Sequence, residues 1–188
     1  RYADVKAIPK DTGRFSSRVF SSDRDEEAVA AMSERGRRAH AAVAAYDASI
    51  VSHSDGEQHA RLRRIAHRAF TPRRVAEMRD AIQRSMDELL EEAAAEPVAD
   101  IKRLAYQLPL IVISDMLGVP AEDRDRIHEW SGAIGRSRGV VDEQRLIEAE
   151  QALAEFARYV AEIVDDLRRR SDRSSLVAAM LDAAQEER

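Results

Sequence analysis

His59 and Arg63 are the residues whose types and spacing most clearly suggest chemistry. They lie four positions apart in segment 57–70, which is predicted to be a helix, so they share one face, one turn apart. Both side chains are hydrogen-bond donors when charged, so they cannot pair with each other. The pair therefore needs an anion, either two carboxylates of one ligand or Asp and Glu side chains from elsewhere in the fold. Each charge-assisted hydrogen bond to that anion contributes on the order of 1.5–3 kcal/mol.

The helix predicted over 57–70 separates its cations into two groups. At about 100° per residue, His59 and Arg63 flank an apolar face. Arg61, Arg64 and Arg68 fall on the opposite face and are predicted to point to solvent. These arginines form either an ordinary solvated helix face or a basic patch. The patch has no interleaved aromatic side chains, so it does not favour nucleic-acid binding. The residues predicted to face the core are Leu62, Ile65, Ala66, Ala69 and Phe70.

The composition excludes several classes of function. The chain has 188 residues and a net charge of -5, so the molecule as a whole is not suited to coating nucleic acid or an anionic membrane. It contains no cysteine, which excludes disulfides, thiolate metal ligands and cysteine nucleophiles from this chain. No apolar run is long enough to span a bilayer, and no signal-peptide pattern is seen. We expect a cytoplasmic location.

The elements that must position these side chains are all predicted to be helices, within a single domain, residues 1–188. Thr71 and Pro72 begin a helix directly after the arginine-rich one, because Thr is a good N-cap and Pro suits the first helical position. An apolar helical stripe continues from there for about five turns. Asp100 is predicted to cap the next helix, within which Pro109 is expected to kink or restart the chain, and Gly118 to end it.

The remaining sequence also favours helices. We predict them at 121–134, 142–170 and 174–181, which gives seven or eight in all. Gly132, Gly135 and Gly139 predict a mobile loop over 132–141. Four other histidines lack the spacing of a helical zinc site and are interpreted as surface or loop residues, namely His40, His53, His67 and His128. No metal-ligand set is therefore predicted.

Segment 55–74 resembles the C-helix signature of bacterial cytochromes P450. The signature consists of an aspartate with two turn residues, then His-x-x-x-Arg, then Phe-Thr-Pro at the start of the next helix. In this chain the matching residues are Asp55, His59 with Arg63, and Phe70-Thr71-Pro72. The resemblance extends over nearly the whole chain. Segment 2–17 resembles the family's B helix and following loop, 105–120 its E helix, 132–141 its F–G loop, 142–170 its G helix and 174–181 its H helix.

The resemblance implies roles for particular residues. His59 and Arg63 would bind the two propionates of haem b. Ile50 and Val51, just before the signature helix, would line the substrate pocket, although they could equally be ordinary loop anchors in the core. The basic patch of Arg61, Arg64 and Arg68 would dock an acidic electron donor of the ferredoxin or flavin type.

The resemblance also implies parts that this chain does not contain. The axial cysteine that holds the haem iron is absent, as is the long central I helix with its acid–threonine pair. Glu155 and Arg158 have the spacing of the family's Glu-x-x-Arg pair, but they lie in the presumed G helix, so we interpret that match as accidental.

We therefore expect an all-α fold, the N-terminal helical part of a cytochrome P450, truncated before the I helix and the haem-thiolate loop. The implied function is part of a haem-thiolate monooxygenase that oxidises a small hydrophobic organic substrate with O2. It would act with the remainder of the P450 chain and is not expected to be active alone. The alternative is a cofactor-free all-α interaction module or a degenerate P450 remnant.

Overall fold

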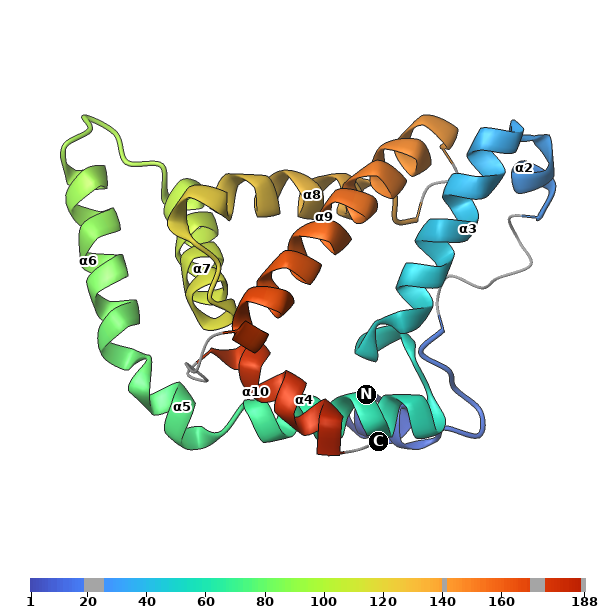
Figure 1. Ribbon diagram of the computed structural model, residues 1–188, viewed down its shortest axis with the longest axis horizontal. Coiled ribbons are helices and arrows are strands. Elements are labelled where there is room, and N and C mark those ends of the chain that lie inside the picture. The colour runs from blue at the N-terminus through green and yellow to red at the C-terminus, as the bar shows by residue number, and fades with distance from the viewer. Residues whose placement is uncertain (19–25, 140–141, 170–174, 187–188) are drawn as a thin grey trace. The chain divides into compact units, whose positions relative to one another are not determined.

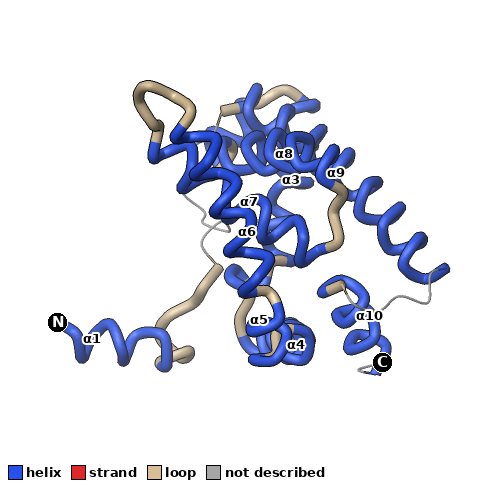
Figure 2. The backbone as a smooth tube through the Cα atoms, turned by 90° about the vertical axis from the view of Figure 1, so that its left-hand side faces the viewer, coloured by secondary structure: helices blue, strands red, loops and turns tan. Residues whose placement is uncertain are grey.

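The computed structural model describes residues 1–18, 26–139, 142–169 and 175–186. All regular structure in these ranges is helical, which confirms the all-α prediction (Figure 1). Figure 2, coloured by secondary structure, shows only helices and the loops between them among the described residues. The described part contains ten α-helices, more than the seven or eight predicted.

The helices follow one another along the chain. Three 3-10 turns accompany them: η1 (Ile8–Lys10), η3 (Val51–His53) and η4 (Ala121–Asp123). The α-helices are α1 (Tyr2–Ala7), α2 (Glu26–Ala31), α3 (Glu34–Ser49), α4 (Gly56–Ala69), α5 (Pro72–Glu77), α6 (Arg79–Ala94), α7 (Ile101–Leu117), α8 (Arg124–Arg136), α9 (Glu143–Arg169) and α10 (Leu176–Glu186).

Several predicted helix boundaries are confirmed by their capping contacts. The Thr71 hydroxyl accepts a hydrogen bond from the Arg74 backbone N–H at 3.3 Å, as an N-cap should. The Asp100 carboxylate accepts from the backbone N–H groups at the start of α7. Gly118 ends α7 in the left-handed region at φ 74°, where a side chain would be strained.

Two boundary predictions were wrong, and a third is tested only in part. The helix predicted to run on from Pro72 is divided at Met78 into α5 and α6. Pro109 lies inside α7, which continues through it and does not restart there, while the alternative of a kink at Pro109 stays a prediction. The loop predicted from residue 132 begins only after Arg136. Its first glycines are helical because buried Trp130 and Ile134 hold the end of α8, against a cost of about 1 kcal/mol per glycine. Residues 140–141 of that predicted loop lie outside the described residues.

The described chain forms two compact units. The first comprises residues 1–64 and 129–159. In it the N-terminal ends of α3 and α9 meet (Figure 1), and the Glu143 carboxylate accepts hydrogen bonds from both the backbone N–H and the hydroxyl of Ser33. Trp130 on α8 is buried and packs on Tyr159 of α9, with ring centroids 5.5 Å apart. These contacts join α3, α8 and α9 around one core.

The second unit comprises residues 65–128 and 160–188. Its centre is the antiparallel pair α6 and α7, joined by a loop (Figure 1), with α10 also in contact with α7. Its buried apolar side chains include Ile65, Leu89, Leu104 and Leu176. Each unit has its own core, and the prediction of a single domain stays a prediction.

Candidate functional site

The helix α4 places His59 and Arg63 one turn apart, as predicted. The helix begins at Gly56 with φ 59°, and the His59 backbone N–H donates to the carbonyl of Asp55 at 3.4 Å. The His59 side chain is half-buried and that of Arg63 is exposed. Within the described residues, neither side chain makes a hydrogen bond or an ion pair. The described residues therefore give no support to the alternative in which Asp or Glu side chains bind the pair. Both side chains remain available to an anion.

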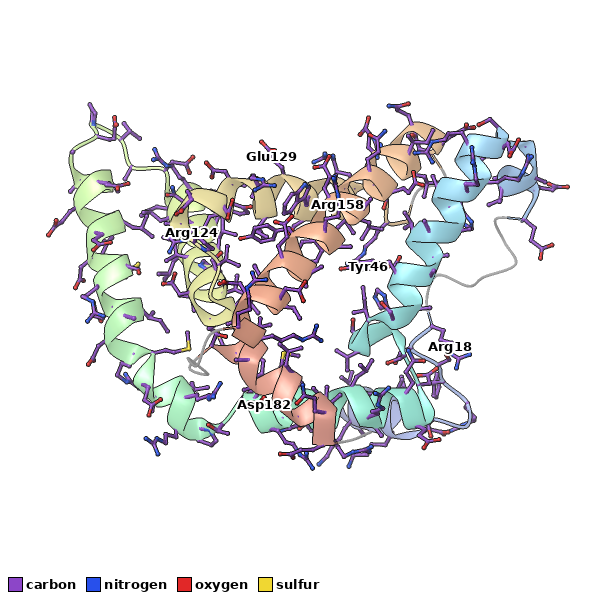
Figure 3. All side chains as sticks on the ribbon, viewed as in Figure 1. Arg18, Tyr46, Arg124, Glu129, Arg158 and Asp182 are labelled. Carbon is purple, nitrogen blue, oxygen red and sulfur yellow. The ribbon has the colours of Figure 1, made fainter. Side chains whose placement is uncertain are left out.

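Asp55 anchors the start of α4 to the segment that follows η1. Its carboxylate accepts a hydrogen bond from the Ser16 hydroxyl at 2.5 Å and from the Ser17 backbone N–H at 3.0 Å. Arg18, labelled in Figure 3, brings its guanidinium within 3.9 Å of the same carboxylate. The Ser16 hydroxyl, and then the Ser17 N–H, lower the pKa of Asp55. The signature aspartate is therefore a fixed anionic anchor for two stretches of chain.

The apolar face predicted for α4 is largely confirmed, with one exception. Ile65 and Ala69 are buried, and Leu62 and Ala66 are half-buried. Phe70 was predicted to face the same core, but it is 43% exposed. Its backbone N–H still donates to the Ala66 carbonyl at 2.9 Å, but its side chain lines a cavity of about 390 Å³ in the second unit.

The three outward arginines of α4 are exposed, as predicted. They differ in their contacts: Arg68 forms a 2.7 Å ion pair with Glu186 of α10, and Arg64 also has an interaction partner. Arg61 has neither a hydrogen bond nor an ion pair to the described residues. The basic patch is thus partly neutralised by the protein itself, and docking of an electron donor on it stays a prediction.

Ile50 and Val51 lie at the end of α3 and the start of η3. The Ile50 backbone N–H donates to the Asp47 carbonyl at 3.2 Å and so closes α3. The Ile50 side chain is half-buried, whereas Val51 is 38% exposed. Val51 is therefore not an ordinary core anchor, while the surroundings of Ile50 suit either interpretation.

Two charged contacts were missed by sequence reasoning. The buried Asp47 carboxylate lies 3.3 Å from an Arg138 guanidinium nitrogen. The Trp130 indole N–H donates to the Glu155 carboxylate at 2.9 Å, so Glu155 has a structural partner in α8. The partners are 91 and 25 positions apart, and no local pattern in the sequence connects them.

Other kinds of site receive no support from the described residues. In that part of the chain no three His, Asp or Glu side chains are grouped so that they could hold a metal ion. None of the described helices is both long enough and apolar enough to cross a membrane.

Comparison with known proteins identifies the relatives of the chain. No family model matches it. It is 38% identical over 131 residues to the polyketide biosynthesis cytochrome P450 PksS of Bacillus subtilis (strain 168), covering 69% of this chain and 31% of that protein. It is 35% identical over 185 residues to mycinamicin IV hydroxylase/epoxidase of Micromonospora griseorubida, covering 97% of this chain and 42% of that protein.

Solved structures agree with the sequence relatives. The crystal structure of CalO2 superposes with a TM-score of 0.80 and 29% identity, covering 100% of this chain and 45% of the CalO2 chain. In all three comparisons the chain spans less than half the length of the relative. The chain is therefore homologous to bacterial cytochromes P450 over roughly the N-terminal 40% of their length.

Proposed function

We propose that this chain forms the N-terminal helical part of a haem-thiolate monooxygenase that oxidises a small hydrophobic organic substrate with O2. When bound, the haem would supply the oxygen chemistry, with its iron ligand coming from outside this chain, which has no cysteine. The residues of this chain would bind and orient the haem and the substrate. We propose a cytoplasmic location for the protein.

One observation carries the proposal. His59 and Arg63 stand one turn apart on α4, and neither has a partner among the described residues, in a chain homologous to cytochromes P450. Two such donors suit the two propionates of haem b, because each carboxylate would gain a charge-assisted hydrogen bond. Arg63 is exposed and His59 half-buried, so both are accessible to a ligand. The residues present therefore fit the group.

The substrate and the electron donor would contact other parts of the first 70 residues. Ile50 and Val51 offer apolar side chains that are only partly buried, which suits contact with a hydrophobic substrate. The names of two relatives refer to polyketide biosynthesis and to mycinamicin IV, and both support an organic natural product as the substrate. Arg61, Arg64 and Arg68 would attract the acidic surface of a ferredoxin- or flavin-type donor.

The test is a spectrum of the complete protein that contains this chain. We expect a Soret band after reconstitution with haem, and the carbon monoxide difference spectrum of a thiolate-ligated haem after reduction. A complete protein that is folded by circular dichroism but shows no Soret band would overturn the proposal. That result would favour a cofactor-free interaction module instead.

A further inference from the structure

Asp47 is a buried carboxylate at the base of the segment that carries Ile50 and Val51. It lies in the last turn of α3, and its side chain is only 4% exposed. Its carbonyl accepts the Ile50 backbone N–H, so the carboxylate lies immediately beside the start of that segment. A carboxylate removed from water is costly unless cations or donors compensate it. The groups that face Asp47 therefore contribute to how the segment is held.

Two side chains from different parts of the first unit face this carboxylate. A guanidinium nitrogen of Arg138 lies 3.3 Å from Asp47 Oδ1, and His53 Nδ1 lies 3.8 Å from the same oxygen. His53 is the last residue of η3, whereas Arg138 follows α8 and is 91 positions away from Asp47. The carboxylate thus connects the end of α3, the turn η3 and the turn 137–139.

Local hydrogen bonds give each of these two turns a defined shape. In turn 137–139, the buried Ser137 hydroxyl donates to the Ile134 carbonyl at 2.8 Å, and the Arg138 backbone N–H donates to Gly135 at 3.2 Å. Gly139 then turns the chain at φ 73°. This geometry fixes the position from which Arg138 reaches Asp47.

The same holds for η3. The His53 backbone N–H donates to the Ile50 carbonyl at 3.0 Å, and the Ser54 hydroxyl donates to the Val51 carbonyl at 3.1 Å. Ser54 itself is buried. Each turn therefore has its own local hydrogen bonds, and each contributes a side chain that faces the Asp47 carboxylate.

We propose that the Asp47–Arg138 ion pair, with His53 beside it, forms a latch that fixes Ile50 and Val51, so that Asp47 and Arg138 are positioning residues for the substrate. The latch stands on its own geometry, and its link to the substrate rests on the function proposed for Ile50 and Val51. Without Arg138, η3 loses its connection to turn 137–139, and its local hydrogen bonds should open more often. A substrate would then meet a less preorganised surface and would bind more weakly.

Hydrogen exchange in the complete protein tests the latch without reference to haem. The reporters are the backbone amides of Ile50 and His53, both of which donate to known carbonyls. In R138Q their exchange should accelerate about tenfold, as expected for loss of a hydrogen bond to a charged group. R138K should restore most of the protection. The matched control is R136Q, because Arg136 is an exposed cation at the end of α8, two positions before Arg138.

R138Q leaves the buried Asp47 carboxylate without its cation, and this could unfold the protein. The double variant D47N/R138Q avoids that problem, because it also removes the charge of Asp47. It removes both partners of the Asp47–Arg138 ion pair and leaves no buried carboxylate, so it should fold while still lacking the latch. Faster exchange at Ile50 and His53 in this variant, with α9 amides unchanged, supports the latch. Wild-type exchange at both amides would overturn it.

A second readout tests the link to the substrate site. Phenylimidazole, a small apolar azole, serves as the probe, and its binding is followed from the shift of the haem band. R138Q should weaken its affinity about fivefold through lost preorganisation, with rescue by R138K. Faster amide exchange with unchanged affinity would keep the latch and overturn the substrate role of Ile50 and Val51. Unchanged exchange would overturn the latch and leave the proposed function standing.

Discussion

Trp130 shows at the scale of single residues how a polar contact is combined with packing. Its ring is buried against Phe156 and Tyr159, while its N–H donates to Glu155. W130F retains an aromatic ring and removes the donor. It should lower the free energy of unfolding by about 2 kcal/mol, from the lost hydrogen bond and some lost volume. Chemical unfolding followed by circular dichroism measures this change.

The control for that variant is E155Q, which keeps an acceptor oxygen for the indole. E155Q should lower the free energy of unfolding by less than about 1 kcal/mol, since only the charge of the acceptor changes. Equal stability of W130F and the wild type would show that the Trp130–Glu155 bond contributes nothing.

Single residues also show what could be predicted from the sequence at this scale. His59 and Arg63 share a helix and a spacing, so their placement on one face follows from helical geometry alone. The contact between Asp47 and Arg138 could not be predicted in this way, because it depends on how α3 and α8 pack. Phe70 was placed in the core from helical geometry, which cannot show that a cavity lies beside it.

At the scale of elements, the junction of α3 and α9 depends on a glycine. A Cβ added at Gly36 would lie 2.5 Å from the Glu143 carboxyl carbon. Glu143 is held by two hydrogen bonds from Ser33 at the N-cap of α3, so it cannot move aside without losing them. G36A should therefore destabilise the protein.

The effect of G36A on the free energy of unfolding should change from destabilising to stabilising when Glu143 is removed. In an E143A background the space beside residue 36 is free, and alanine favours the helix over glycine by about 0.5–1 kcal/mol. A double-mutant cycle of G36A and E143A, measured by chemical unfolding, tests this. The same destabilisation by G36A in both backgrounds would show that the junction does not depend on Glu143.

Element boundaries were predictable where a local signal sets them. Thr71, Asp100 and Gly118 act as caps through their own side chains or backbone, and all three were predicted correctly. The break at Met78 was not predicted. The apolar stripe that runs through Met78 continues on both sides of it, so no local signal marks the break.

At the scale of the whole molecule, several anchored carboxylates should make stability depend on acidity. The Ser33 hydroxyl lowers the pKa of Glu143, a hydrogen bond from Arg35 lowers the pKa of Glu150, and the Ser16 hydroxyl lowers the pKa of Asp55. Their ordinary values are 4.5, 4.5 and 3.8. Each folded pKa lies below its unfolded value, so these groups stabilise the protein above about pH 4.5.

Stability should accordingly be lost as the pH falls from 4.5 through the folded pKa values, because protonation removes these contacts. The unfolding midpoint in urea, measured between neutral and acid pH, follows the loss. E143Q should make the acid dependence shallower, since one of the titrating groups is gone. An acid dependence identical to that of the wild type would exclude Glu143 as a contributor.

The rate of haem loss from the complete protein tests the proposed role of His59 and Arg63 in holding the haem propionates. The measurement is the rate of haem transfer to excess apomyoglobin for the wild type, for H59Q/R63Q and for R61Q, a control on the opposite face of α4. Removing two charge-assisted hydrogen bonds should speed haem loss in H59Q/R63Q by roughly ten- to a hundredfold, with R61Q unchanged. Haem loss from H59Q/R63Q at the wild-type rate would contradict the claim.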